Sequence, residues 1–509
     1  MALVGAILIL LGAHWIRRAE LPRRDIVIDA RNCHTPATIL DPPSGVTPMG
    51  AASVLHGLSA DRRVMMYLGS DFAGHGFRTY LFDLAGHGDS TDRFTFPRAE
   101  QCATVAIDSL TRSGAIDPRT TILLGHSMGG AIAVRMADHH PVAATIALSP
   151  APMTLPQRMP SNLLVLAGGL DLWPVKREAR ALADAAGGER TASSDFAERR
   201  AFELVVLPYA THTTGLLDRG VAHRAERWAM QALFPSVPPK TLALNLDLAT
   251  YETFSSGRRR LAGAVLGLIG LVFLFPVALE IASKLAGPAR EDSSSLRPSR
   301  ALAAAEGAAG ALAAVFILSV ALPLRFLHLY GGSYLASLLL IGGLFLLALN
   351  PKAAKEAWKP HARPVVAAAL LGFAAFLATG AWLDWQLADM WMDAPRWTRF
   401  VELLPVAFVF CFAEEVVLGA VEDGGRRALR YFIALTLRLE LWLACLLAYY
   451  RLLHGDILIL ILFFTLAAFS AAQRLATDGL RVRTGSPIGA ALFGAILAAW
   501  FIAAIFPLS

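Results

Sequence analysis

The residues best suited to chemistry form the pentapeptide Gly125-His126-Ser127-Met128-Gly129. It follows a strand-like run at 120–124 and precedes a run of small residues typical of a helix. A serine at such a sharp strand-to-helix turn is exposed for nucleophilic attack, and flanking glycines let the chain turn that tightly. The pattern therefore predicts Ser127 as a nucleophile, with Gly125 and Gly129 as the small residues that the turn requires.

A general base and an acid that orients it follow later in the chain. Strand-like runs recur at 144–148, 162–167 and 202–207. Asp171 comes just after the second of these runs, and His212 lies in the loop after the third. An acid just past the C-terminal end of a strand is well placed to hold an imidazole in one tautomer. We therefore predict a catalytic triad of Ser127, Asp171 and His212.

The same chemistry needs donors for the oxyanion that forms during acyl transfer. A buried strand-like run at 51–55 leads into His56-Gly57-Leu58. The backbone N–H groups of Leu58 and Met128 are predicted to hold the oxyanion, with Gly57 leaving room for the substrate oxygen. In the Gly-rich turn at 83–90, Asp83 and His87 are expected to hold the turn rather than act on substrate.

With these motifs, the segment from about residue 45 to 235 resembles the α/β-hydrolase superfamily, and most of all its serine-aminopeptidase-like and monoacylglycerol-lipase-like branch. The resemblance implies a mostly parallel sheet flanked by helices, and hydrolysis of an ester, thioester or amide through Ser127. It leaves the substrate open, since one fold of this kind hosts many reactions. Many relatives carry a helical cap after the strand that follows the nucleophile. Here only residues 149–161, with four prolines, fill that gap, which predicts a domain without a large cap.

The remainder of the chain has the composition of a membrane protein. Of its 509 residues 55% are hydrophobic, and the mean hydropathy of +0.51 is high for a soluble enzyme. Apolar runs near the roughly 20 residues needed to cross a bilayer recur after residue 260. Eight spans are predicted, at 261–283, 301–322, 332–349, 364–383, 402–421, 429–450, 456–473 and 487–507. The predicted organisation is an N-terminal anchor at 1–24, an α/β-hydrolase domain at 25–236, a linker at 237–260 and a membrane domain at 261–509.

Three charged residues inside the predicted spans form a possible intramembrane polar site. Glu414 and Glu415 lie well inside one span, and Arg438 lies inside the next. An ionisable group in hydrocarbon is costly, so a paired or water-lined site is expected. Both an ion pair joining two helices and a cavity for a headgroup, ion or proton remain open. Paired glutamates in a span are also similar to intramembrane proteases of the CAAX-processing type, although that family's pattern has an Arg where this chain has Gly419.

The charge distribution and the cysteine content indicate which classes of partner and cofactor to expect. The net charge of +6 comes with basic residues in loops at span ends, so it is explained by membrane flanks and predicts no nucleic-acid partner. Cys411 and Cys445 lie in spans as small apolar residues, whereas Cys33 and Cys102 in the hydrolase portion could pair. Motifs for metals or organic cofactors are lacking, so we expect neither. The expected partners are the lipid bilayer and a lipid or acyl substrate.

Two functions follow from this organisation. The first is a membrane-anchored serine hydrolase that acts on a lipid or lipid-linked substrate. The alternative is a transporter or intramembrane enzyme with an accessory hydrolase domain. The basic residues of the predicted loops divide about two to one between the two sides of the membrane. Because the richer side is expected in the cytoplasm, the hydrolase domain is predicted on the non-cytoplasmic side of the cell membrane.

Overall fold

The computed structural model describes residues 1–136, 139–238, 256–288, 300–320, 327–359, 361–419, 425–451 and 457–509. The chain forms two compact units. The sheet unit comprises Leu8–Gly267, Leu383–Asp389 and Leu508–Ser509. The helical unit comprises Met1–Ile7, Leu268–Trp382 and Met390–Pro507. The predicted linker at 237–260 lies largely outside the described residues.

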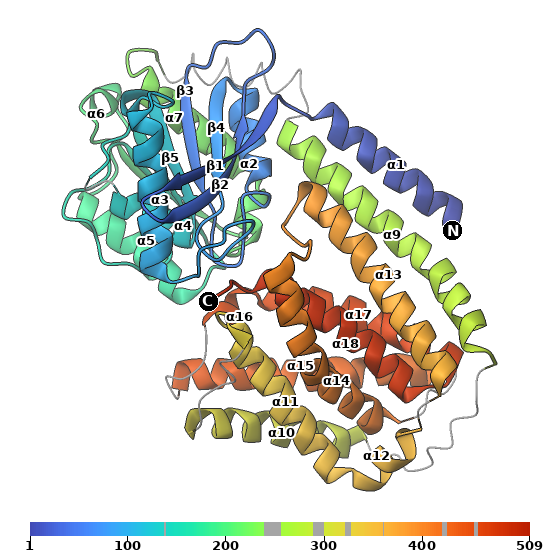
Figure 1. Ribbon diagram of the computed structural model, residues 1–509. Helices are drawn as coiled ribbons and strands as arrows, with labels where there is room; N and C mark the ends of the chain where they lie inside the picture. Colours follow the sequence, from blue (N-terminus) through green and yellow to red (C-terminus); the bar gives the residue numbers. More distant parts are fainter. Residues whose placement is uncertain are drawn as a thin grey trace. The chain divides into compact units, whose positions relative to one another are not determined.

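The sheet unit is built on a mostly parallel sheet, as predicted (Figure 1). Its described strands are β1 (Arg23–Ala30), β2 (Cys33–Leu40), β3 (Gly50–Leu55), β4 (Phe77–Phe82), β5 (Thr121–His126), β6 (Ala144–Leu148), β7 (Leu163–Gly168) and β8 (Phe202–Leu207). They are ordered β1-β2-β4-β3-β5-β6-β7-β8, and every pair from β4 to β8 is parallel. The predicted runs at 144–148 and 202–207 coincide with β6 and β8.

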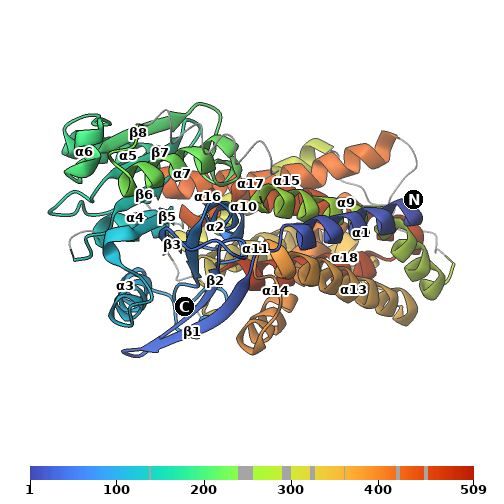
Figure 2. The ribbon, with the colours of Figure 1, turned by 90° about the horizontal axis from the view of Figure 1, so that it is seen from above.

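Helices cover both faces of this sheet (Figure 2). One face packs against α2 (Met66–Gly74) and α7 (Arg219–Leu233), and the other against α3 (Phe96–Arg112), α4 (Met128–Met136) and α5 (Trp173–Ala186). Shorter elements are η1 (Pro118–Thr120), α6 (Ser193–Ala197) and η2 (Thr214–Leu217). Every residue of β5, β6 and β7 is buried, which is why these strands read as continuous apolar runs rather than alternating ones.

The antiparallel hairpin of β1 and β2 was not predicted from the sequence. It extends the sheet beyond β4, and its turn residues Arg31 and Asn32 have φ of 45° and 64°. A two-residue turn of this kind needs positive φ at both positions, which Asn tolerates but Arg rarely adopts. The turn was therefore hard to recognise.

The connection between β6 and β7 contains no helix over residues 149–162. The four prolines expected to prevent a helical cap lie in this stretch. The prediction of an α/β fold without a large cap is thus confirmed at this connection.

The described helices outside the hydrolase-like region are α1 (Ala2–Arg18), α9 (Ser256–Ala286), α10 (Arg300–Val320), α11 (Gly332–Leu349), α12 (Pro351–Ala357), α13 (Ala362–Gln386), α14 (Ala394–Leu418), α15 (Gly425–Arg451), α16 (Ile457–Ile461), α17 (Phe463–Thr484) and α18 (Pro487–Ile505). Within the helical unit, α14 packs against α11 and α18. A Cβ at Gly343 would lie 2.9 Å from the Phe410 Cα, so glycine is what lets α11 and α14 approach this closely.

Six helices in the described part of the chain are long and apolar enough to cross a membrane. They are Gly257–Ala286, Leu302–Val320, Gly332–Leu349, Ala362–Gln386, Ala428–Tyr450 and Pro487–Ile505. The other two predicted spans, 402–421 and 456–473, fall on α14 and on α16 with α17. The helix α14 contains the three carboxylates Glu402, Glu414 and Glu415, and the second predicted span is divided between α16 and α17, which are separated at Leu462. Six of the predicted spans thus have a candidate helix in the described residues, and the spans at 402–421 and 456–473 stay predictions.

Candidate active site

Ser127 occupies the sharp turn between β5 and α4. Its φ is +53°, in the left-handed region, and its N–H donates to the Leu148 carbonyl at 2.8 Å. A Cβ at Gly125 would lie 2.1 Å from the Gly129 carbonyl oxygen, and one at Gly129 would lie 2.4 Å from the Leu55 carbonyl oxygen. Neither position accepts a side chain, which is the physical reason for glycine on both sides of the serine.

The structure brings His212 into hydrogen-bond contact with both Ser127 and Asp171. The His212 Nε2 lies 2.8 Å from the Ser127 Oγ, and its Nδ1 lies 2.8 Å from the Asp171 Oδ1. All three residues are buried. Burial alone would raise the pKa of Asp171, but the hydrogen bond and charge of His212 outweigh it, so that pKa is lowered. An ionised Asp171 favours the tautomer in which His212 presents an unprotonated Nε2 to the serine.

Two adjoining loops position the acid and the base. The N–H of Gly169, after β7, donates to the Leu207 carbonyl at 2.7 Å, and that of Leu170 donates to the Ala210 carbonyl at 3.0 Å. A Cβ at Gly168 would lie 2.4 Å from the Ala210 carbonyl oxygen. The loop carrying Asp171 is therefore tied to the loop carrying His212 by backbone contacts rather than by the triad alone.

The predicted oxyanion loop is fixed by His56. Its Nε2 accepts the Leu84 N–H at 2.9 Å, and its Nδ1–H donates to the Gly57 carbonyl at 2.7 Å. Burial is the main cause that lowers the pKa of His56, so the ring is neutral in this tautomer. A Cβ at Gly57 would lie 2.8 Å from the His126 Nδ1 and 3.1 Å from the Ser127 Cβ. Gly57 thus lets this loop pack against the serine turn, a reason beyond the room for substrate that we expected.

The donors predicted for the oxyanion, Leu58 and Met128, lie on these two segments. Leu58 directly follows Gly57, and Met128 begins α4 directly after Ser127. The close approach of Gly57 to Ser127 brings the two segments together. That their N–H groups hold an oxyanion remains a prediction.

Asp83 holds the turn after β4, as the sequence suggested. Its carboxylate accepts the N–H of Arg62 at 2.8 Å and that of Asp89 at 2.9 Å, and it pairs with the Arg62 guanidinium. His87 accepts the Ser59 N–H at 3.2 Å. These contacts leave Asp83 and His87 as supports for the loops around the site. Arg62 was missed because its partners come from a segment about twenty residues later.

His126 contacts the backbone of His212, a role that the sequence reasoning also missed. Its Nε2–H donates to the His212 carbonyl at 2.9 Å, and its ring centroid lies 5.1 Å from that of His212. Burial, followed by the charge of His212, lowers the pKa of His126 to about 3. A neutral His126 therefore supports the backbone of His212, the predicted general base.

The low pKa of His126 predicts a specific acid sensitivity. The unfolded chain takes up this proton near pH 6.5 and the folded chain only near 3, so stability is lost as pH falls through that window. The loss from this group is at most about 1.4 kcal/mol per pH unit. His126→Gln keeps an N–H donor without a titration, so its Tm should fall less steeply than that of the wild type between pH 6.5 and 4. The exposed His139→Gln is the control. Equal slopes in all three proteins would contradict this role of burial.

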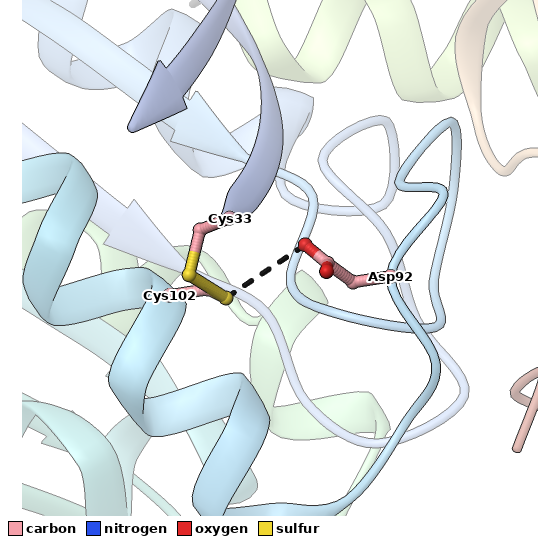
Figure 3. Close-up of side chains that lie close together, drawn as sticks. All are labelled: Cys33, Asp92 and Cys102. Atoms are coloured by element: carbon pink, nitrogen blue, oxygen red, sulfur yellow. Dashed lines mark hydrogen bonds between the residues drawn. A yellow bond between two sulfur atoms is a disulfide. The ribbon is translucent and has the colours of Figure 1, made fainter. Parts of the chain in front are cut away.

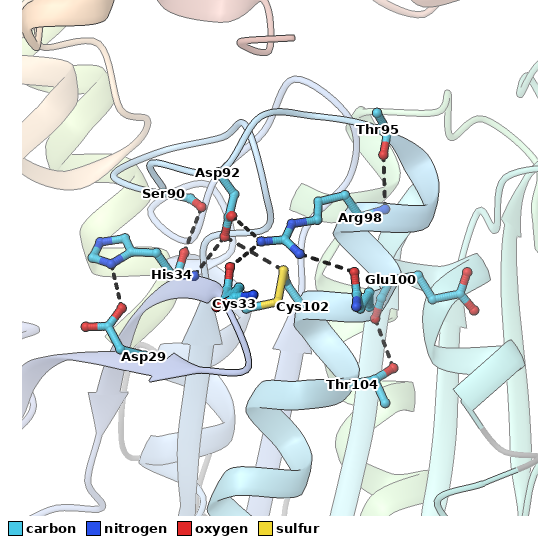
Figure 4. The surroundings of a disulfide bond; sticks show 12 residues. Asp29, Cys33, His34, Ser90, Asp92, Thr95, Arg98, Glu100, Cys102 and Thr104 are labelled. Carbon is cyan, nitrogen blue, oxygen red and sulfur yellow. Dashed lines mark hydrogen bonds and ion pairs between the residues drawn. A yellow bond between two sulfur atoms is a disulfide. The ribbon is translucent and has the colours of Figure 1, made fainter.

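A disulfide joins strand β2 to helix α3 in the sheet unit. Cys33, at the start of β2, is bonded to Cys102 in α3, with the two Cα atoms 5.3 Å apart (Figure 3). Asp92 Oδ2 is 3.7 Å from the Cys102 Sγ, and the same carboxylate is bound by the Arg98 guanidinium at 2.6 Å and the His34 N–H at 2.7 Å (Figure 4). The sulfur atoms of Cys33 and Cys102 are bonded to each other. With Asp92, these residues therefore form a structural cross-link rather than a set of thiolate metal ligands.

In the helical unit, the charged residues picked out from the sequence join a larger group. Glu414 binds the Arg438 guanidinium through both carboxylate oxygens, each at 2.7 Å. Glu415 binds Arg430 and Arg474 at 2.6 Å and Arg481 at 3.2 Å. We call this group the buried ion-pair cluster, and it consists of Glu414, Glu415, Arg430, Arg438, Arg474, Asp478 and Arg481. The spacing of Arg474, Asp478 and Arg481 by four and three residues was an available signal, since it places them on one face of a helix.

Residues 54–269 match a family model described as the alpha/beta hydrolase family. The sheet unit has the α/β-hydrolase fold. The narrower branch suggested by the motifs remains a prediction.

Two curated relatives show local similarity. The chain is 35% identical over 112 residues to a protein of Mycobacterium phage D29 named "Putative non-heme haloperoxidase", covering 21% of this chain and 39% of that protein. It is 31% identical over 100 residues to an uncharacterized protein of Mycobacterium tuberculosis, covering 20% and 36%. The chain thus spans less than half the length of these curated relatives.

Among solved structures, similar chains include an esterase from Pyrococcus furiosus, 15% identical, with a TM-score of 0.35, covering 42% of this chain and 92% of that one. A serine hydrolase from Xanthomonas campestris, described as lacking a lid, is 18% identical, with a TM-score of 0.34 and coverage of 41% and 95%.

Proposed function

We propose that the protein is a membrane-anchored serine hydrolase that cleaves an ester, thioester or amide bond of a lipid or lipid-linked substrate. The observation that carries the proposal is the hydrogen-bonded series from Ser127 through His212 to Asp171, with 2.8 Å at each step. Such a series activates a hydroxyl that is otherwise a weak nucleophile.

In the proposed reaction, the Ser127 Oγ attacks the substrate carbonyl while His212 Nε2 takes its proton. Asp171 stabilises the imidazolium that forms. The N–H groups of Leu58 and Met128 receive the developing oxyanion, and the protonated His212 then delivers its proton to the leaving group. Water repeats the sequence on the acyl-enzyme and releases the acid. The residues assigned here need neither a metal nor an organic cofactor for these steps.

Exposed apolar side chains close in sequence to Asp171 and His212 support a lipid substrate. Leu170 and Trp173, which flank Asp171, are 62% and 61% exposed, while Tyr209 and Leu217, near His212, are 89% and 46% exposed. We call these four residues the apolar rim. Exposed apolar side chains on the loops of a site favour contact with an apolar partner. The lack of a helical cap over residues 149–162 leaves this rim uncovered by the connection that often shields such sites.

Competition against fluorophosphonate labelling of the full-length protein tests the substrate class. A long-chain monoacylglycerol in micelles should protect Ser127 from the probe better than a short soluble ester. Leu170→Ser with Trp173→Ser should lower kcat/KM on the long-chain ester by about tenfold, because apolar contact is lost, while the short ester is unaffected. Val27→Ser with Val46→Ser is the control, since both residues are exposed elsewhere. Equal losses on both esters would contradict a lipid-specific rim.

The proposed location of the hydrolase domain is the non-cytoplasmic side of the membrane. The Cys33–Cys102 disulfide supports it, since such bonds persist mainly in oxidising compartments. The distribution of basic residues in the loops supports the same side.

Reporter fusions after Pro235 test this topology. A phosphatase that is active only outside the cytoplasm should be active there, and a fluorescent protein that matures only in the cytoplasm should remain dark. Cys33 and Cys102 should resist alkylation until a reductant is added, whereas Cys33→Ser should free Cys102. The reverse reporter pattern would place the substrate in the cytoplasmic leaflet.

The alternative function, a transporter or intramembrane enzyme with an accessory hydrolase domain, has one observation in its favour, the buried ion-pair cluster. The arginines of that cluster bind both glutamates, and mutual pairing is the arrangement expected of a structural element. We therefore favour the hydrolase.

A further inference from the structure

The helical unit encloses an apolar cavity that none of the proposed hydrolytic steps uses. Its volume is about 430 Å³, and it lies among α11, α14, α15, α17 and α18. That volume falls within the roughly 300–1,000 Å³ range of small-molecule sites. Leucine, phenylalanine and alanine side chains make up most of the wall, including Leu338, Phe410 and Phe501. The cavity therefore suits a hydrocarbon occupant.

One guanidinium lies at the wall of this cavity, held in place on three sides. The Arg438 Nε and Nη2 bind Glu414 at 2.7 Å, and its Nη1 donates to the Ser470 carbonyl at 2.9 Å and the Gln473 Oε1 at 2.6 Å. These contacts use four of the five guanidinium N–H groups. Arg438 is thus fixed at a defined point of the wall. The contacts to described residues leave one N–H of Nη2 for an acceptor from outside the protein.

A second donor lies one helical turn away. Trp442 is four residues after Arg438 on α15 and lines the same cavity. Its Nε1 is buried and has no hydrogen-bond partner in the described part of the chain. A buried N–H without an acceptor is costly and rare in a folded protein. Because Arg438 and Trp442 line the cavity from neighbouring turns of α15, one acceptor group placed in the cavity would lie near both side chains.

The cavity is reached through apolar side chains. Leu439 on α15 is 45% exposed, and Ala467 on α17 is also exposed, although both line the cavity. An entrance bordered by such residues admits a hydrocarbon chain more readily than a hydrated solute.

We propose that this cavity binds a single long-chain fatty acid, with its carboxylate at Arg438 and Trp442 and its alkyl chain against the apolar wall. A carboxylate supplies the acceptor that both donors call for, and its hydrogen bond to a guanidinium is charge-assisted. The site goes beyond the proposed hydrolysis and includes no triad residue, although a free fatty acid is also the class of product that hydrolysis of a lipid ester releases.

Photolabelling of the purified full-length Ser127→Ala protein tests the proposal with a diazirine derivative of palmitic acid. Labelled peptides should come from α11, α15 and α17. Unlabelled palmitic acid should compete at least about tenfold better than methyl palmitate, which has no anionic carboxylate. Equal competition would leave only an apolar groove and overturn the carboxylate site. The Ser127→Ala protein lacks the proposed nucleophile, so fatty-acid labelling is measured without hydrolysis. Failure of the labelling is therefore distinguishable from failure of the proposed esterase activity.

Variants of two adjacent alanines provide a matched comparison. Ala467 lines the cavity, whereas its exposed neighbour Ala468 on α17 does not. Ala467→Phe should reduce labelling at least about tenfold by filling the entrance, and Ala468→Phe should leave it unchanged. Unchanged labelling in Ala467→Phe would overturn the proposal. Glu414→Gln with Arg438→Gln removes both charges of the pair together, and should abolish the preference for the acid over its methyl ester. If that double variant does not fold, the Ala467 comparison decides.

Discussion

Ser127→Ala is expected to abolish fluorophosphonate labelling and to lower kcat by about 10³-fold or more. The reason is the local geometry, since the Ser127 Oγ lies 2.8 Å from the His212 Nε2 at the sharp turn between β5 and α4. Asp171→Asn and His212→Ala should cost a comparable factor, because each breaks one step of the same hydrogen-bonded series. Steady-state hydrolysis of a chromogenic ester, with labelling on a gel, measures both effects.

The control for this series is Ser113→Ala, an exposed serine at the end of α3 whose hydroxyl donates to the Leu110 carbonyl. It should retain activity and labelling. Full activity in His212→Ala would show that another histidine acts as the base. His56 and His126 are poor substitutes, because each already uses a ring nitrogen to hold a backbone carbonyl.

The sequence was sufficient to select three residues that the structure brings into hydrogen-bond contact, because each follows a strand end in a recognisable order. The contacts that support the triad depend on chain segments far apart. His126 meets the carbonyl of a residue 86 positions later, and His56 meets the N–H of Leu84. A single sequence offers no local signal for such contacts, so these histidines were recognised only from the structure.

The ion pairs of the helical unit were also only partly predictable from the sequence. The pairing of Glu414 with Arg438 was among the expected possibilities, since both lie in neighbouring apolar helices. The partners of Glu415 come instead from the beginning of α15 and from α17, through Arg430 and Arg474. Which arginine reaches which carboxylate depends on helix rotation and packing, which the spacing of charges along the chain does not determine.

Glu415→Gln is expected to destabilise the helical unit by about 3–5 kcal/mol, the cost of removing one partner from a buried ion pair. Glu415 is only 2% exposed and binds three guanidinium groups, so a neutral amide would leave buried positive charge uncompensated. The thermal unfolding of the detergent-purified protein, followed by tryptophan fluorescence, should show a lower Tm for the helical unit.

Glu402→Gln on the same helix is the matched control. Glu402 pairs with Arg399 three residues earlier, and its side chain is 30% exposed, so the loss should be at most about 1 kcal/mol. Hydrolysis of a soluble ester by Glu415→Gln at low temperature should persist, since none of the triad contacts involves α14. A Glu415→Gln protein as stable as the wild type would contradict the structural role. It would favour the alternative in which these carboxylates serve a separate membrane activity, because a glutamate that does not stabilise its surroundings needs another reason to remain in an apolar helix.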